Sequence, residues 1–176
     1  RAAWVLYTQG YEEPARAFAR RAVAGIEQWP QSAREGDVGR NALNFSLQVL
    51  EDWAALRRSY DETSRRGGAL GPSSRILGAR FRILMGDTTG VLALVDSTRT
   101  QPLAAYAGGW NRLGLPRYYG AQLLALLGRK DEAVALLREA MNSGWRNNPE
   151  EQLLWFWAPL KDYPPFQEIM KLKDGS

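Results

Sequence analysis

Tight turns recur along this chain at similar intervals, and each is flanked by stretches with helical periodicity. The turns lie near residues 10, 50, 86 and 128, which spaces them by about 36 to 42 residues. On either side of them, apolar residues stand three and four positions apart, as in an amphipathic helix. Self-similarity over this length is typical of helical-repeat arrays. We therefore predict a fold made of successive helix–turn–helix units.

The clearest copy is YYGAQLLALLGRKDEAVALLREAMNSG, residues 118–144. Its first helix is predicted to end at Gly128, because a glycine has no Cβ that would clash in a left-handed C-cap. Asp131 and Glu132 then suit the first turn of a second helix, where acidic side chains complement the dipole. A short connection requires the two helices to be antiparallel. The same pattern recurs more loosely elsewhere, which predicts helix pairs over about 2–28, 38–64, 73–98 and 115–143.

The segment LLALLGRKDEAVALLREAM resembles a tetratricopeptide repeat, which pairs two helices over 34 residues. The matching positions are Ala121, Leu124, Gly128, Ala133, Leu137 and Ala140. GYEEPARAFARRA is similar but carries Pro14 as an insertion, and residues 42–60 and 79–98 match in outline only. The resemblance implies an all-α, right-handed α-solenoid of about four antiparallel helix pairs over residues 1–144. Longer connections are expected at 29–37 and 65–72.

The tail, WRNNPEEQLLWFWAPLKDYPPFQEIMKL, resembles the segment that closes tetratricopeptide regions in multidomain bacterial proteins. Such proteins include transcriptional regulators, adenylate cyclases and serine/threonine kinases. A solenoid needs a cap, because its last repeat would otherwise expose an apolar face. Residues 145–176 are therefore predicted to form capping helices, and the chain to be the C-terminal module of a longer protein. The expected covering residues are Trp155, Phe156, Trp157, Phe166 and Ile169.

The composition restricts the chemistry that this chain can perform. It contains no cysteine and no histidine, which excludes a Ser-His-Asp triad, thiolate catalysis and Cys- or His-based metal sites. Adjacent acids occur at helix starts, or at a helix end for Asp61–Glu62, where capping or a solvated surface explains them better than catalysis. GDTTG, residues 86–90, lacks the Gly-Lys-Ser/Thr ending of a phosphate-binding loop. We therefore predict no catalytic residues, no cofactor and no metal.

Two broader partner classes are also disfavoured by the sequence. The net charge is +4, but the arginines occur as dispersed pairs with acids nearby, such as Arg57–Arg58 next to Asp61–Glu62. A nucleic-acid surface usually shows a concentrated basic stripe, so nucleic acid is not the expected partner. Nothing resembles the 18 or more consecutive apolar residues of a membrane span.

The resemblance implies a concave groove, lined by the first helix of each pair, that receives a protein or peptide segment. The arginine fork could contact a carboxylate with two hydrogen bonds. The expected function is therefore protein–protein interaction or sensing without catalysis. The residues predicted to face the groove are Asn41, Phe45, Gln48, Arg80, Tyr118 and Gln122.

Two alternatives stay open at this point. A small-ligand-binding helical domain predicts an internal pocket with converging polar groups. A structural subunit of a larger assembly predicts an apolar patch on the outer face, around Trp29 or Trp110. For Trp110 and Trp145, which lie beside glycines in connections, packing over the loop is favoured over an exposed contact.

Overall fold

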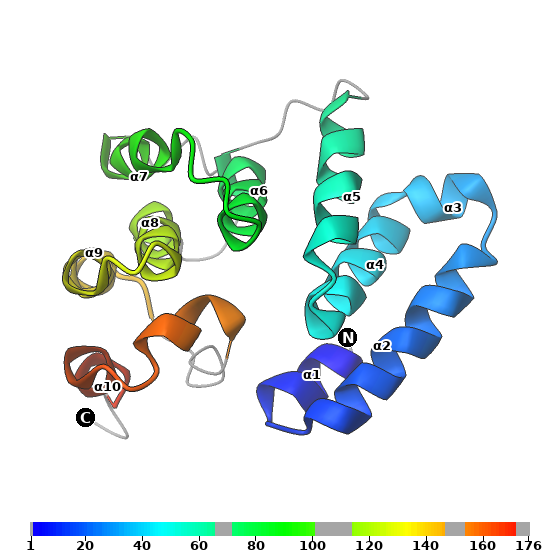
Figure 1. The fold of residues 1–176 in the computed structure, drawn as a ribbon, viewed down its shortest axis with the longest axis horizontal. Helices are drawn as coiled ribbons and strands as arrows, with labels where there is room; N and C mark the ends of the chain where they lie inside the picture. The colour runs from blue at the N-terminus through cyan, green and yellow to red at the C-terminus, as the bar shows by residue number, and fades with distance from the viewer. Residues whose placement is uncertain (1, 66–71, 101–113, 147–153, 172–176) are drawn as a thin grey trace. The chain divides into compact units, whose positions relative to one another are not determined.

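The computed structural model describes residues 2–65, 72–100, 114–146 and 154–171. Every regular element within those ranges is a helix, which confirms the predicted all-α class. None of these helices combines the length and the apolar character that crossing a membrane requires. The elements in Figure 1 are α1 (Ala2–Thr8), α2 (Glu12–Glu27), α3 (Gln31–Glu35), α4 (Asp37–Leu50), α5 (Trp53–Arg65), α6 (Pro72–Leu84), α7 (Val91–Thr100), α8 (Leu115–Leu126), α9 (Lys130–Asn142), the 3-10 helix η3 (Trp155–Leu160) and α10 (Pro164–Met170).

The chain divides into two compact units. The N-terminal unit, Arg1–Gly68, holds α1 to α5, and the C-terminal unit, Ala69–Ser176, holds α6 to α10. The predicted capping segment therefore belongs to the same unit as α6 to α9. Helices occupy each of the four ranges in which helix pairs were expected.

The N-terminal unit is built around small residues where helices meet. Helix α2 packs against α1 and α4, and α4 also packs against α3 and α5. Ala15 and Ala19 of α2 are fully buried in a cluster with Val49 of α4. Trp4 and Tyr7 pack against this cluster from α1. An alanine side chain takes up little space between two helix backbones, so Ala15 and Ala19 allow the close approach of helices that buries Val49.

The connection expected over residues 29–37 is itself partly helical. Pro30, with φ −51° and ψ 145°, stands immediately before the five-residue helix α3. The Gln31 side-chain amide donates to Glu35 Oε1 at 2.8 Å, one turn later. Such pairs four residues apart support a short helix locally. Residues 66–71 of the other expected connection lie outside the described ranges.

The four predicted turns share one backbone geometry. Gly10, Gly86 and Gly128 have φ of 83°, 82° and 75°, which confirms the glycine turns, and the turn near residue 50 uses Glu51 with φ 58°. In each, the left-handed residue's N–H donates to the carbonyl three residues earlier, and the next N–H donates to the carbonyl five before it. This pair of bonds is the Schellman C-cap. It recurs at Gly144, which ends α9.

Helix α8 is the centre of the C-terminal unit. It packs against α6, α7, α9 and η3, and Figure 1 shows it between α7 and α9. Most of its residues are buried, including Leu123 and Leu124. Gly120 has no room for a side chain, because a Cβ there would lie 2.5 Å from Thr98 Oγ1 and 2.9 Å from Leu136 Cδ2. A glycine at this position therefore lets α7 and α9 close on α8.

The predicted covering residues are all buried, between 0% and 8% exposed. Trp157 is fully buried, 5.1 Å from the Phe166 ring and 5.8 Å from the Tyr118 ring between centroids. The conformation differs in one respect from the expected apolar helix: the described part of that stretch, Trp155–Leu160, is a 3-10 helix with Pro159 inside it. Proline removes a backbone donor, which suits a short, tighter helix.

Candidate functional site

The six predicted groove residues fall into two groups in the structure. Asn41 is exposed and Phe45 is 40% exposed, so both remain accessible. The other four are interior residues: Gln48 is 7% exposed, Arg80 6%, Tyr118 3% and Gln122 1%. The expectation that these four present an open surface to a partner is therefore not met. Each of the four is buried by packing within its own unit.

Arg80 of α6 is held between polar and aromatic groups of its own unit. Its Nη2 donates to the side-chain oxygen of Gln122 on α8, 42 residues away in sequence. Its guanidinium carbon lies 5.1 Å from the Tyr119 ring centroid and 4.8 Å from that of Phe156. A cation between two ring faces is attracted by both quadrupoles, more strongly when water is excluded. Arg80 thus joins α6, α8 and η3 instead of offering its fork to a ligand.

Tyr118 is covered by the tryptophan that follows α9. The Tyr118 and Trp145 rings stack with centroids 4.4 Å apart and planes 25° apart. Trp145 therefore packs over its loop, as predicted, and Trp110 lies outside the described residues. Gln48 is buried on α4 in the N-terminal unit, where one face of the helix meets α1 and α2.

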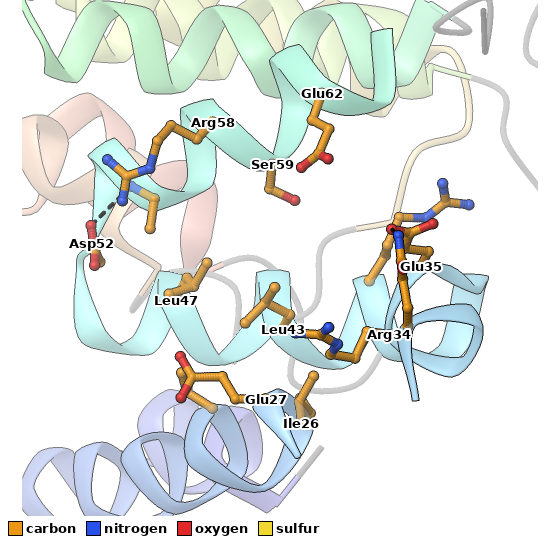
Figure 2. A pocket seen from close by; sticks show the side chains of 14 residues that line it. Ile26, Glu27, Arg34, Glu35, Leu43, Leu47, Asp52, Arg58, Ser59 and Glu62 are labelled. Atoms are coloured by element: carbon orange, nitrogen blue, oxygen red, sulfur yellow. Dashed lines mark hydrogen bonds between the residues drawn. The ribbon is translucent and has the colours of Figure 1, made fainter. Parts of the chain in front are cut away.

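The structure instead presents an open pocket of about 540 Å³ in the N-terminal unit (Figure 2). Four helices contribute to it: the C-terminal end of α2, one face of α3, one face of α4 and one face of α5. The residues that line it are Val23, Ile26, Glu27, Gln31, Arg34, Glu35, Arg40, Leu43, Leu47, Asp52, Ala55, Arg58, Ser59 and Glu62. Its existence depends on α3, the helix that sequence reasoning did not anticipate.

The pocket has an apolar floor and a charged rim. Ile26 and Leu47 are 5% and 6% exposed, and the half-buried Leu43 lies between helices α2 and α5 (Figure 2). The rim carries charges of both signs, drawn from α2, α3, α4 and α5. Such a site can enclose an apolar side chain while polar groups at its edge fix the orientation of the bound molecule.

Several rim groups are already engaged within the chain. Glu35 accepts from Gln31, and Asp52 Oδ1 accepts from the Ala55 N–H at 2.9 Å, which caps the first turn of α5. Ser59 donates to Asn44 Oδ1 at 3.0 Å. These contacts help to position Glu35, Asp52 and Ser59 at the rim.

The pocket uses a different face of α4 from the one that sequence reasoning selected. Arg40, Leu43 and Leu47 are spaced i, i+3 and i+7, so they lie along one stripe of the helix. The predicted Asn41 and Phe45 lie on the neighbouring stripe, where Phe45 instead contacts the Trp4 ring at 5.5 Å. The sequence does show this Arg-Leu-Leu stripe on α4. Spacing alone could not indicate that α3 and α5 pack around it to form a pocket.

A second, smaller hollow lies at the start of α9. It is lined by residues 128–132 and Tyr163, with a volume of about 370 Å³. The Tyr163 hydroxyl donates to Asp131 Oδ1, and this hydrogen bond raises the pKa of Tyr163 above its usual value. Arg129 forms two hydrogen bonds to Glu132 across the rim. These mutual contacts occupy the side chains of Arg129, Asp131, Glu132 and Tyr163 in the hollow. Among the described residues, no group of three or more acidic side chains is placed to hold a metal ion.

Comparison with protein-family models, curated proteins and solved structures gives no match to this chain. The resemblance to tetratricopeptide repeats therefore stays a prediction.

Proposed function

We propose that this chain is a non-catalytic recognition module that binds a peptide or protein segment in the pocket of its N-terminal unit. The observation that carries this proposal is the combination of a buried apolar floor, Ile26 and Leu47, with a rim that carries charges of both signs. One apolar side chain of the partner packs on the pocket floor, and the charged rim contacts the partner residues on either side of that side chain. This is a common way for helical surfaces to hold peptide anchors.

We also propose that the helices form a right-handed, tetratricopeptide-like array of about four antiparallel pairs, closed by the aromatic cap. The repeated Schellman turns at Gly10, Glu51, Gly86 and Gly128 support this architecture, because each ends the first helix of a proposed pair. The packing of α4 on α1 and α2, and of α8 on α6 and α7, supports it as well. Arrays of this kind present binding surfaces without catalysis.

The test is selection from a random-peptide library displayed on phage, with the full chain as bait. We expect wild-type protein to enrich peptides that share an apolar anchor, and Leu43→Asp to lose them, because a carboxylate on the floor costs the apolar contact. Val38→Asp is the matched control: Val38 also lies on α4, is 76% exposed and does not line the pocket. Both variants must keep wild-type helical circular dichroism. Equal enrichment by wild type and Leu43→Asp would place the binding site elsewhere.

A small molecule in the same pocket is the second candidate. The volume of about 540 Å³ favours it, since small-molecule sites commonly measure roughly 300–1,000 Å³. Native mass spectrometry of the full chain purified from its own organism distinguishes the two candidates. A bound species of defined mass that Leu43→Asp loses supports a small ligand, whereas peptide selection without such a species supports the recognition module.

A further inference from the structure

We infer that the segment bound in this pocket carries acidic residues on either side of its apolar anchor, and that Arg34 and Arg58 recognise their carboxylates. The inference rests on the proposed function, because it specifies the chemistry of the partner at the same site. It follows from which rim charges the chain already satisfies and which it leaves available.

The acidic rim groups are largely engaged. Asp52 caps α5, and Glu35 accepts from Gln31. Glu62 also has an interaction within the chain. Glu27, on α2, is the fourth carboxylate of the rim.

The cationic rim groups are in the opposite state. Arg40 has an interaction within the chain, but neither Arg34 nor Arg58 makes an ion pair with another residue in the described part of the chain. The contrast with its neighbour is direct: Arg57 pairs with Asp61 at 3.6 Å, whereas Arg58 turns to the pocket. Arg34 and Arg58 are therefore the rim cations that an incoming carboxylate can engage.

The two arginines approach from different helices. Figure 2 shows Arg34 extending from α3 and Arg58 from α5, with Leu43 and Leu47 between them in this view. A segment that inserts an apolar side chain onto the floor therefore passes one arginine before the anchor and the other after it. A guanidinium can hold a carboxylate with two parallel hydrogen bonds, and both arginines are exposed at the rim, where a partner can reach them.

The test repeats the random-peptide selection with charge-reversed baits. We expect wild-type protein to enrich aspartate and glutamate on both sides of the apolar anchor. The double variant Arg34→Glu/Arg58→Glu should instead enrich lysine and arginine there, while keeping the same anchor. Each single variant should weaken a selected acidic peptide about tenfold in Kd by fluorescence anisotropy, the change expected for one lost charged contact.

The control is Arg20→Glu/Arg21→Glu, which changes the net charge equally at exposed positions of α2 outside the pocket. It should keep the wild-type acidic preference. Apolar-anchored peptides without acidic flanks, or an acidic preference that Arg20→Glu/Arg21→Glu also removes, would overturn this inference and leave the proposed function standing. Enrichment no greater than that of Leu43→Asp would overturn the proposed function, and the inference with it.

Discussion

At the scale of single residues, Arg80 shows how one buried cation can organise a helical unit. Its hydrogen bond to Gln122 and its two aromatic neighbours, Tyr119 and Phe156, connect three elements. Burying a charge is costly unless hydrogen bonds and neighbouring groups compensate for it, and these contacts supply part of that compensation. Arg80 therefore links α6 to α8 and η3, and the contribution of these contacts to stability can be tested by substitution.

We predict that Arg80 and Gln122 are energetically coupled. Gln122→Leu should lower the free energy of unfolding by about 1–3 kcal/mol, because Arg80 loses a buried acceptor. Arg80→Met keeps much of the stem packing but loses both contacts of the guanidinium. The double variant should lose less than the sum of the two single losses, with a coupling of about 0.5–3 kcal/mol by urea unfolding. If the stability losses of the two single variants are strictly additive, Arg80 and Gln122 are not coupled, and this prediction is wrong.

We predict that deprotonation of Tyr7 at alkaline pH lowers the stability of the N-terminal unit. Burial is the main cause that raises its pKa above the ordinary 10.0, Glu51 and Glu12 add to it, and Arg16 opposes it. A raised pKa means that the folded state keeps its proton while the unfolded state loses it. The stabilisation is therefore complete below the unfolded pKa and lost as pH rises through the folded one.

The measurement compares wild type with Tyr7→Phe by urea unfolding at about pH 8 and about pH 11, on either side of the ordinary tyrosine pKa. We expect wild type to lose more stability than Tyr7→Phe between the two values. Every other titrating group is common to both proteins, so the difference reports Tyr7. A difference that is independent of pH would show that the tyrosine has an ordinary pKa.

At the scale of elements, two helical glycines of the C-terminal unit should respond oppositely to alanine. Gly120→Ala places a Cβ against Thr98 and Leu136, and the resulting overpacking should cost about 1–3 kcal/mol. Gly78→Ala in α6 meets nothing within 4 Å and should stabilise by about 0.5–1 kcal/mol, because alanine is the better helix former. Thermal unfolding followed by circular dichroism measures both. A stabilising Gly120→Ala would mean that α7 and α9 do not close on α8.

At the scale of the whole molecule, the chain has a net charge of +4, but many of its arginines form local ion pairs with acidic residues. Within the described residues, the pairs include Arg16–Glu51, Arg57–Asp61, Arg82–Asp87, Arg99–Asp96, Arg117–Glu139 and Arg129–Glu132. Arginines paired in this way release few counterions from a nucleic acid. We therefore expect fluorescence anisotropy to detect no binding to a labelled DNA duplex at physiological salt. Binding that persists there would contradict the prediction that nucleic acid is not a partner.

Local features of the chain were predictable from sequence because they depend on neighbours along it. The helical periodicity, the glycine turns at Gly10, Gly86 and Gly128, and the buried aromatic residues of the cap follow from spacing and side-chain type alone. Glu51 shows the limit of this reasoning. Its turn has the same geometry as the glycine turns, although a left-handed glutamate is disfavoured by its Cβ and gives no composition signal.

The candidate site required the tertiary structure. Periodicity identifies the stripes of α4 but not which stripe meets another helix, and the pocket forms on the Leu43 stripe because α3 and α5 close around it. Arg80 and Gln122 were both selected as exposed groove residues, yet they meet in the interior across 42 positions of sequence. The sequence by itself determined the all-α class and the glycine turns, because helical periodicity and turn geometry are local. Only the packing of helices decided which polar side chains are buried and which line a pocket, because burial depends on contacts between distant segments.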